Sequence, residues 1–291
     1  MHRRTLLLSA AALPLLQTGA WAQSGGAVNV LYAGSLVNLM EHGIGPAFTK
    51  TGDGVFQGFG GGSNGLANQI KGRLRHGDVF ISATANVNDT LTGEANGNWV
   101  SWYATFAQSP LMIGYNPSSR FANDLKTKPW YEVMQEPGIR IARTDPKLDP
   151  KGQLTVKLLD EASKLYNLPN LSKAVLGDPE NPAQVFPEET LIGRLQSGQL
   201  DAGFFYATET SDLKIPAIAL PPETPLGASY TVTVLNNAAN AEGAAQFVSF
   251  LLGAQGAAIM RQHGLQVVKP TVTGNAALVP ASLRSVLEAA K

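Results

Sequence analysis

The chain contains 291 residues, of which 44% are hydrophobic and 15% are charged, a composition typical of folded globular proteins rather than disordered ones. Its 22 basic residues balance 22 acidic residues, so no basic excess favours nucleic acid and no long charged run favours a membrane surface. The sequence contains no cysteine, which excludes disulfides, thiolate metal sites and thiol catalysis, and its length allows two domains of ordinary size.

Residues 1–22 have the pattern of a secretory signal peptide. The basic residues Arg3 and Arg4 precede the apolar segment Thr5–Leu16, and Ala20-Trp21-Ala22 forms a small-residue cleavage site. The apolar segment is too short to remain as a membrane span. We therefore expect export and cleavage after Ala22, and the pair Arg3-Arg4 also fits the twin-arginine export route.

Strands alternate with helices along the first part of the mature chain. Leu66, Ile70 and Leu74 recur at four-residue spacing, which is typical of a helix with one buried face. Buried strands are predicted at 28–32, 55–59 and 78–82, and helices at 36–48 and 64–75. This alternation predicts a parallel sheet with helices on both faces.

The same alternation restarts in the second part of the chain. Strands are predicted at 111–115, 140–142, 202–206 and 230–235, and helices at 153–166, 188–197 and 241–261. Breaks near 104–110 and 221–229 mark two crossings between the halves, and the C-terminal helix is expected to return to the first half. We therefore expect an α/β fold of two Rossmann-like lobes joined by two crossover segments, with lobe I at 23–106 and 228–291 and lobe II at 107–227.

Two serines occupy equivalent positions in the predicted sheet. Ser35 follows the first strand and opens a helix, and Ser63 follows the second strand after Gly60-Gly61-Gly62. A helix start attracts anions through its free N–H groups, and glycine lets a ligand approach the backbone closely. Serine adds a neutral hydroxyl donor at the carboxyl ends of neighbouring strands, where open α/β sheets bind ligands. This pattern predicts a site for a small oxyanion that needs no lysine or arginine.

Other interpretations of these residues remain open. Both serines fit a simpler role as helix N-caps, and the two roles are compatible. Glu188 and Glu189 fit either a pair of catalytic carboxylates or acidic residues in the first turn of a helix. No G-K-[ST] sequence follows the glycines, and Ser35 has neither a Gly-x-Ser-x-Gly elbow nor an obvious histidine partner. We predict that the chain is not an enzyme, and an exported serine or carboxylate hydrolase is the alternative from a different class.

Several segments of the sequence resemble the periplasmic molybdate-binding proteins and their tungstate-binding relatives. They are Tyr32-Ala33-Gly34-Ser35-Leu36, Gly62-Ser63-Asn64-Gly65-Leu66-Ala67-Asn68-Gln69-Ile70, Asp78-Val79-Phe80-Ile81-Ser82-Ala83, Asp145-Pro146, Pro150-Lys151-Gly152 and Asp201-Ala202-Gly203-Phe204-Phe205-Tyr206-Ala207-Thr208. The similarity covers nearly the whole mature chain. It implies a type II periplasmic binding protein fold, in which two lobes close over an anion.

The resemblance also implies a set of ligand-binding residues. The two serine ligands of the family match Ser35 and Ser63, and its tyrosine hydroxyl donor matches Tyr206. A backbone donor of the second lobe falls at Lys151, where the family usually has a small residue, so this lysine is a departure. A further backbone donor near the start of the next helix is placed at Glu189.

Asp149 matches the first of two carboxylates that complete six-fold coordination in the tungstate-binding relatives. The second position is held by Phe205, which cannot coordinate. We therefore expect a tetrahedral anion held by hydrogen bonds without direct metal coordination, with the charge of Asp149 offset by Lys151. The resemblance implies molybdate or tungstate as ligand, an ABC-transporter permease as partner, no cofactor and a monomer. Sulfate, phosphate or a small carboxylate is the alternative ligand.

Overall fold

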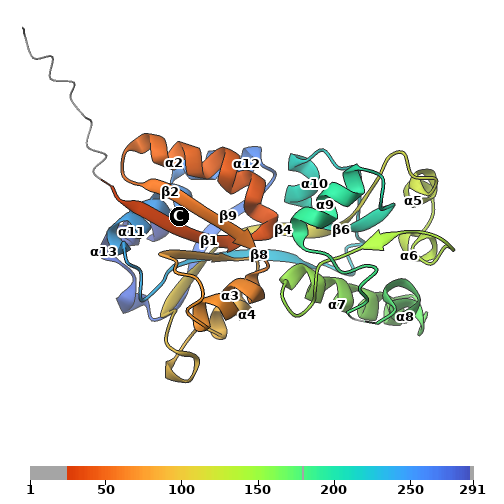
Figure 1. Ribbon diagram of the computed structural model, residues 1–291, viewed down its shortest axis with the longest axis horizontal. Helices are drawn as coiled ribbons and strands as arrows, with labels where there is room; N and C mark the ends of the chain where they lie inside the picture. The colour runs from red at the N-terminus through yellow and green to blue at the C-terminus, as the bar shows by residue number, and fades with distance from the viewer. Residues whose placement is uncertain (1–24, 179, 289–291) are drawn as a thin grey trace, which may run out of the picture.

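The computed structural model describes residues 25–178 and 180–288, so the predicted signal peptide and its cleavage site lie outside the described residues. Figure 1 shows two lobes side by side, each with helices packed around its own part of a sheet. The strands are β1 (Ala27–Ala33), β2 (Val55–Gly61), β3 (Val79–Ser82), β4 (Trp102–Tyr115), β5 (Ile141–Ala142), β6 (Ala202–Tyr206), β7 (Ala217–Ala219), β8 (Gly227–Val234) and β9 (Gln266–Gly274).

The helices of the first lobe come from both ends of the chain. They are α1 (Val37–Leu39), α2 (Gly45–Thr51), α3 (Ser63–Lys71), α4 (Ala85–Asp89), α11 (Ala241–Leu252), α12 (Ala254–Gln262) and α13 (Ala281–Glu288), with the 3-10 turns η1 (Gly34–Leu36), η3 (Glu94–Asn96) and η4 (Ala276–Leu278) and the π-helical turn η2 (Met40–Ile44). The helices of the second lobe are α5 (Ala122–Thr127), α6 (Trp130–Val133), α7 (Pro150–Leu165), α8 (Leu171–Leu176), α9 (Glu188–Gln196) and α10 (Ala207–Asp212).

Parallel strand pairs organise each lobe. In the first lobe β1 pairs in parallel with both β2 and β3, and β3 pairs antiparallel with β8. In the second lobe β5 pairs in parallel with β6. The strand order across the described sheet is β2-β1-β3-β8-β4-β6-β5, and β7 and β9 also pair with β4. Because parallel strands end at the same edge of a sheet, η1 and α3 begin next to each other.

Strand β4 runs through both lobes. Its residues 104–110 pair antiparallel with β8, and its residues 111–115 pair antiparallel with β6. The crossing that the sequence placed at 104–110 therefore lies inside one continuous strand rather than in a loop. The prediction of two α/β lobes joined by two crossover segments is confirmed, with β4 and β8 as the connections, whereas the residue bounds of the lobes stay a prediction.

A buried apolar core joins the two ends of the chain in the first lobe. Phe48 of α2 packs edge to face on Phe247 of α11, with ring centroids 5.2 Å apart, and α11 contacts both β1 and β8. The return of the C-terminal helix to the first lobe is therefore confirmed. Burial of rings of this size is a main source of stability, since each fully buried apolar side chain contributes about 1.5–3 kcal/mol.

Two predicted helices end differently in the structure. The helix predicted at 64–75 ends at Lys71, because Arg73 adopts φ +54, and Leu74 is 80% exposed instead of inward-facing. The helix predicted at 241–261 is split at Gly253, whose extended backbone caps both α11 and α12. No single helix in residues 25–178 and 180–288 is long and apolar enough to cross a membrane, and α11 with α12 meets that test only as a pair bent by 60°.

Candidate ligand-binding site

Helix starts from both lobes face each other where the lobes meet. The turn η1 begins at the carboxyl end of β1, and α3 begins after β2. From the second lobe, the starts of α9 and α10 lie on the same junction, since both helices contact η1. Free N–H groups at helix starts favour anionic ligands.

Glycines allow the two lobes to touch at this junction. The backbone N–H of Gly65 in the first lobe donates to the carbonyl oxygen of Leu148 in the second lobe at 3.0 Å. A Cβ atom at Gly62 would lie 2.4 Å from the same oxygen, and one at Gly34 would lie 3.3 Å from the side chain of Glu188. The lobes are therefore closed against each other, and a side chain at Gly62 would keep them apart.

Both predicted serines lie at the junction, and their hydroxyl groups are used differently. Ser35 Oγ lies 2.9 Å from the hydroxyl of Tyr230, and either atom can be the donor. Ser63 is buried, and its Oγ accepts from the backbone N–H of Ala83 at 3.1 Å, which leaves its own O–H to donate. Neither side chain caps its helix in the described chain, and Gly62 is the N-cap of α3, so the simpler N-cap interpretation is wrong.

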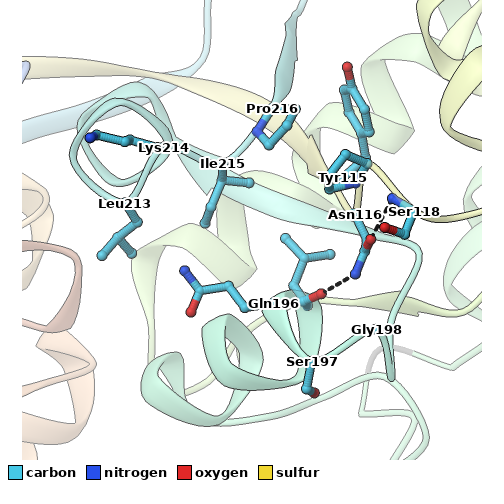
Figure 2. Close-up of a pocket in the computed structure, with 12 residues that line it drawn as sticks. Tyr115, Asn116, Ser118, Gln196, Ser197, Gly198, Leu213, Lys214, Ile215 and Pro216 are labelled. Atoms are coloured by element: carbon cyan, nitrogen blue, oxygen red, sulfur yellow. Dashed lines mark hydrogen bonds between the residues drawn. The ribbon is translucent and has the colours of Figure 1, made fainter.

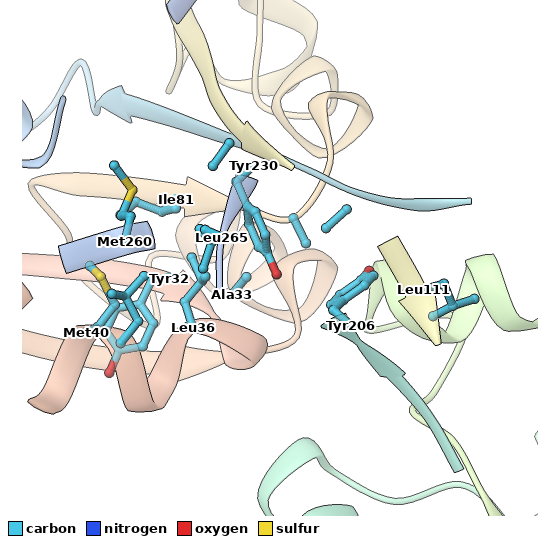
Figure 3. Close-up of a cluster of buried hydrophobic side chains, with 14 of the residues drawn as sticks. Tyr32, Ala33, Leu36, Met40, Ile81, Leu111, Tyr206, Tyr230, Met260 and Leu265 are labelled. Atoms are coloured by element: carbon cyan, nitrogen blue, oxygen red, sulfur yellow. The ribbon is translucent and has the colours of Figure 1, made fainter. Parts of the chain in front are cut away.

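The two tyrosines at the junction face each other. Figure 3 shows Tyr206 of β6 and Tyr230 of β8 where the lobes meet, and their rings pack edge to face with centroids 6.2 Å apart. The hydroxyl of Tyr206 is buried and has no hydrogen-bond partner among the residues that the structure describes. Burial, followed by the neighbouring negative charges, raises the pKa of Tyr206 well above its usual value. The phenol is therefore a neutral donor at every physiological pH.

Asp149 forms the N-cap of α7. Its Oδ1 accepts from the backbone N–H of Lys151 at 2.8 Å, so Asp149 occupies the backbone donor that the resemblance implied at Lys151. Burial, and then the charge of Glu188, raise the pKa of Asp149 to about 7, although the Lys151 ammonium partly opposes this. The carboxyl group therefore changes charge near neutral pH.

The side chain of Lys151 is fully buried between two glutamates from other helices. Its Nζ donates to Glu188 at the start of α9, and to both carboxyl oxygens of Glu209 in α10 at 2.8 and 3.1 Å. Burial alone would lower the pKa of Lys151, but the two glutamates outweigh it and raise the pKa above its usual value. Sequence reasoning did not bring these three side chains together.

A cavity of about 260 Å³ opens between the lobes beside these groups. Its lining includes the three glycines at the end of β2 and, from the second lobe, Asp149, Glu188 and Glu189. Glu189 is exposed at its edge. Ser35, Ser63, Lys151 and Tyr206 are not among its described lining residues, so of the predicted site residues only Asp149 and Glu189 line this cavity.

A family model of bacterial extracellular solute-binding proteins matches residues 28–266. The chain belongs to this family. The extracellular nature of the family agrees with the expected export of this solute-binding protein, and cleavage after Ala22 and the export route stay predictions.

Relatives of the solute-binding protein cover most of its length. It is 28% identical over 258 residues to an uncharacterized solute-binding protein of Petrotoga mobilis, which covers 78% of this chain and 79% of the relative. It is 26% identical over 239 residues to the molybdate/tungstate-binding protein WtpA of Thermococcus kodakarensis, with 66% and 67% covered. The solved periplasmic molybdate-binding protein of Azotobacter vinelandii is similar with a TM-score of 0.64 at 19% identity, with 84% of this chain and 100% of that chain covered. The structural likeness confirms the periplasmic binding protein fold.

A second cavity, of about 370 Å³, lies in the second lobe of the solute-binding protein (Figure 2). Its polar groups mainly hold the surrounding loops. The side chain of Asn116 donates to the carbonyl oxygen of Leu195 at 2.7 Å and accepts from the backbone N–H of Ser118 at 2.7 Å. The junction between the lobes, where an unpartnered hydroxyl is buried, is the stronger candidate for the solute site.

Three residues at this junction escaped the sequence-based site. The sequence predicts only a strand at Tyr230, it fits Glu188 to a catalytic or a helix-start carboxylate, and it gives no signal for Glu209. The alternating pattern of the predicted strand at 230–235 is the only sequence signal for Tyr230. It does not indicate a contact with Ser35, because the two residues are 195 positions apart in the chain. Phe205 is fully buried, with its ring centroid 5.3 Å from Lys151 Nζ.

Proposed function

We propose that this solute-binding protein captures a tetrahedral oxyanion, molybdate or tungstate, and presents it to the permease of an ABC importer. The relatives named as molybdate- or tungstate-binding support this ligand class. The observation that carries the proposal is the buried hydroxyl of Tyr206, which lacks a protein acceptor in the described chain. An oxyanion between the lobes supplies that acceptor.

The binding mode that we propose uses neutral donors. The hydroxyl groups of Ser35, Ser63 and Tyr206 supply hydrogen bonds from both lobes, and helix-start N–H groups add to them. Each hydrogen bond to a charged group contributes about 1.5–3 kcal/mol. Several such bonds therefore support tight binding even after the costs of association and lobe closure. A side chain such as Phe205 cannot ligate a metal atom, which favours hydrogen bonding of the intact tetrahedral anion.

The finer features of the proposal concern export and assembly. We propose that the mature protein starts at Gln23 after removal of residues 1–22, acts in the periplasm as a monomer and has no enzymatic activity. A closed binding site whose donors are hydroxyl and backbone groups suits reversible capture and release rather than covalent chemistry.

Replacement of Ser35 or Ser63 by alanine is expected to weaken molybdate binding about tenfold or more, because each change removes a hydrogen bond to a charged oxygen. Isothermal titration calorimetry with molybdate measures this loss. A thermal-shift panel of molybdate, tungstate, sulfate, phosphate and small carboxylates identifies the preferred anion beforehand, since a ligand that binds only the folded state raises the melting temperature. Ser197→Ala, in the exposed loop after α9, is the control. Unchanged affinity in both site variants contradicts the role of the serines.

Anion affinity is expected to fall as the pH rises through about 7, because Asp149 loses its proton there and adds a negative charge beside the site. Below that pH the carboxyl group is neutral and does not repel the anion. The affinity loss approaches about tenfold per pH unit above the pKa if binding requires one proton. Calorimetry across this range with wild-type protein and Asp149→Asn checks it. The variant carries no titrating group at 149, so the same pH profile in both proteins contradicts the prediction.

A further inference from the structure

Three ionisable side chains meet behind the proposed anion site. Lys151 comes from the first turn of α7, Glu188 is the first residue of α9, and Glu209 lies in the first turn of α10. Their side chains are 0%, 3% and 2% exposed, respectively. The Lys151 ammonium contacts both carboxyl groups, so the three side chains tie together three helix starts of the second lobe.

The charges in this cluster do not balance if every group is ionised. One ammonium faces two carboxylates, which leaves a net negative charge that is almost completely removed from water. Burying such an unpaired charge is costly, and a buried group changes its protonation state instead. Asp149 of the α7 start is a third carboxyl group nearby, and the phenols of Tyr206 and Tyr230 stay neutral because burial raises their pKa.

One oxygen in the cluster needs a donor. Oε2 of Glu188 is buried and receives no hydrogen bond from the donors of the described residues. The carboxyl group of Glu209 is held in place by a backbone hydrogen bond, because its Oε2 accepts from the N–H of Tyr206 at 2.7 Å. A proton on Glu209 supplies the donor that Glu188 lacks.

The pKa values of the two glutamates shift in opposite directions, which decides which of them keeps a proton. Burial, and then the charge of Glu188, raise the pKa of Glu209 well above its usual value. Burial also acts to raise the pKa of Glu188, but the Lys151 ammonium outweighs it through its charge and its hydrogen bond and lowers that pKa. Glu209 is therefore the group that keeps a proton, and Glu188 is the ionised partner of Lys151.

We propose that Glu209 holds a proton that it shares with Glu188, so that the cluster of Lys151, Glu188 and Glu209 carries no net charge. On the proposed function, which this inference assumes, the three residues are positioning residues for an oxyanion site. They hold the starts of α7, α9 and α10 together, and they do so without presenting a negative charge to the bound anion.

Infrared difference spectroscopy tests the proton directly. Spectra of wild-type protein minus Glu209→Gln, recorded at about pH 9 where Asp149 is ionised, are expected to show the carbonyl band of a protonated carboxylic acid that shifts in deuterated water. In Glu209→Gln the amide oxygen accepts from the backbone N–H of Tyr206. The amide N–H group replaces the acid proton as donor to Glu188, but it takes the place of an oxygen that accepts from Lys151. No such band in the difference spectrum overturns the proposal.

Calorimetry with molybdate at the same pH tests the charge of the cluster. If the cluster is neutral, Glu209→Gln leaves its charge unchanged, and the variant does not bind molybdate more tightly than wild type does. If both glutamates are ionised, the variant removes a negative charge and binds molybdate about tenfold more tightly. That gain in affinity overturns the proposal, whereas equal or weaker binding agrees with a neutral cluster that positions the helix starts.

A matched control separates local from global charge effects. Glu161→Gln removes one negative charge from the C-terminal half of α7, where the Glu161 side chain is 38% exposed and pairs with Lys157, and its affinity is expected to equal that of wild type. The two proposals fail in different ways. A wild-type protein that binds no oxyanion in the thermal-shift panel defeats the proposed function. The infrared band tests the proton on Glu209 separately, because it is recorded without any ligand.

Discussion

Lys151→Met is expected to lower the free energy of unfolding by about 3–5 kcal/mol, the usual cost of removing one partner from a buried ion pair. The methionine side chain fills most of the space of lysine but leaves the Glu188 charge buried without its ammonium. The starts of α7, α9 and α10 also lose the group that joins them. Urea unfolding of the ligand-free protein at neutral pH measures the change.

Lys147→Met is the matched control for this loss. Lys147 lies in the loop before α7 and pairs with Glu180 at 2.6 Å, but the two side chains are 68% and 56% exposed. An exposed pair of this kind contributes at most about 1 kcal/mol. Equal losses in the two variants would show that the buried cluster stabilises the fold no more than a surface ion pair does.

Gly62→Ala is expected to weaken anion binding about 5- to 150-fold, because the closed lobes leave no room for a Cβ atom at this position. The new atom would lie 2.4 Å from the carbonyl oxygen of Leu148, a backbone atom of the other lobe. Gly62 has φ −57 and ψ 128, a conformation that alanine adopts without strain, so the contact across the lobes is the main effect. Such overpacking costs about 1–3 kcal/mol and is relieved when the lobes open.

Gly65→Ala provides the comparison for the closure effect. Its added Cβ would lie 3.8 and 3.9 Å from Leu148, which is ordinary contact. Calorimetry with molybdate measures affinity, and small-angle X-ray scattering with and without molybdate measures compaction. Gly62→Ala is expected to show less compaction than Gly65→Ala, with a similar unfolding free energy when no ligand is present. Equal affinities in the two variants would show that the close contact between Gly62 and Leu148 is not needed for anion binding.

Local sequence patterns predicted where Ser35 and Ser63 lie in the fold. Ser35 and Ser63 each follow a buried strand and begin a helical segment, and this order depends only on neighbouring residues. The strands at 28–32, 55–59 and 78–82 accordingly match β1, β2 and β3 closely. The apolar run of 241–261 did not predict the break between α11 and α12. Its hydrophobic periodicity continues across Gly253, whereas the helical backbone is interrupted there.

The acidic half of the site depends on contacts that no local pattern contains. Lys151 meets Glu188 and Glu209 from 37 and 58 residues away along the chain. Each of these residues has an ordinary local interpretation in the first turn of a helix, where charged groups are common. Only the packing of three helix starts against one another turns them into a single buried cluster, and Tyr230 similarly reaches Ser35 only when β8 crosses between the lobes.

The lobes are connected by two hydrogen-bonded strands, β4 and β8, and not by flexible loops. Their ladder shifts register between Thr105 and Ala107, and an irregularity of this kind bends a strand pair and increases its local twist. Tyr230 pairs with Ala107 at this register shift. The residue that contacts Ser35 therefore lies where the strand pair is irregular. Bending of the two strands there would change the angle between the lobes, so a ligand that contacts both lobes would fix that angle.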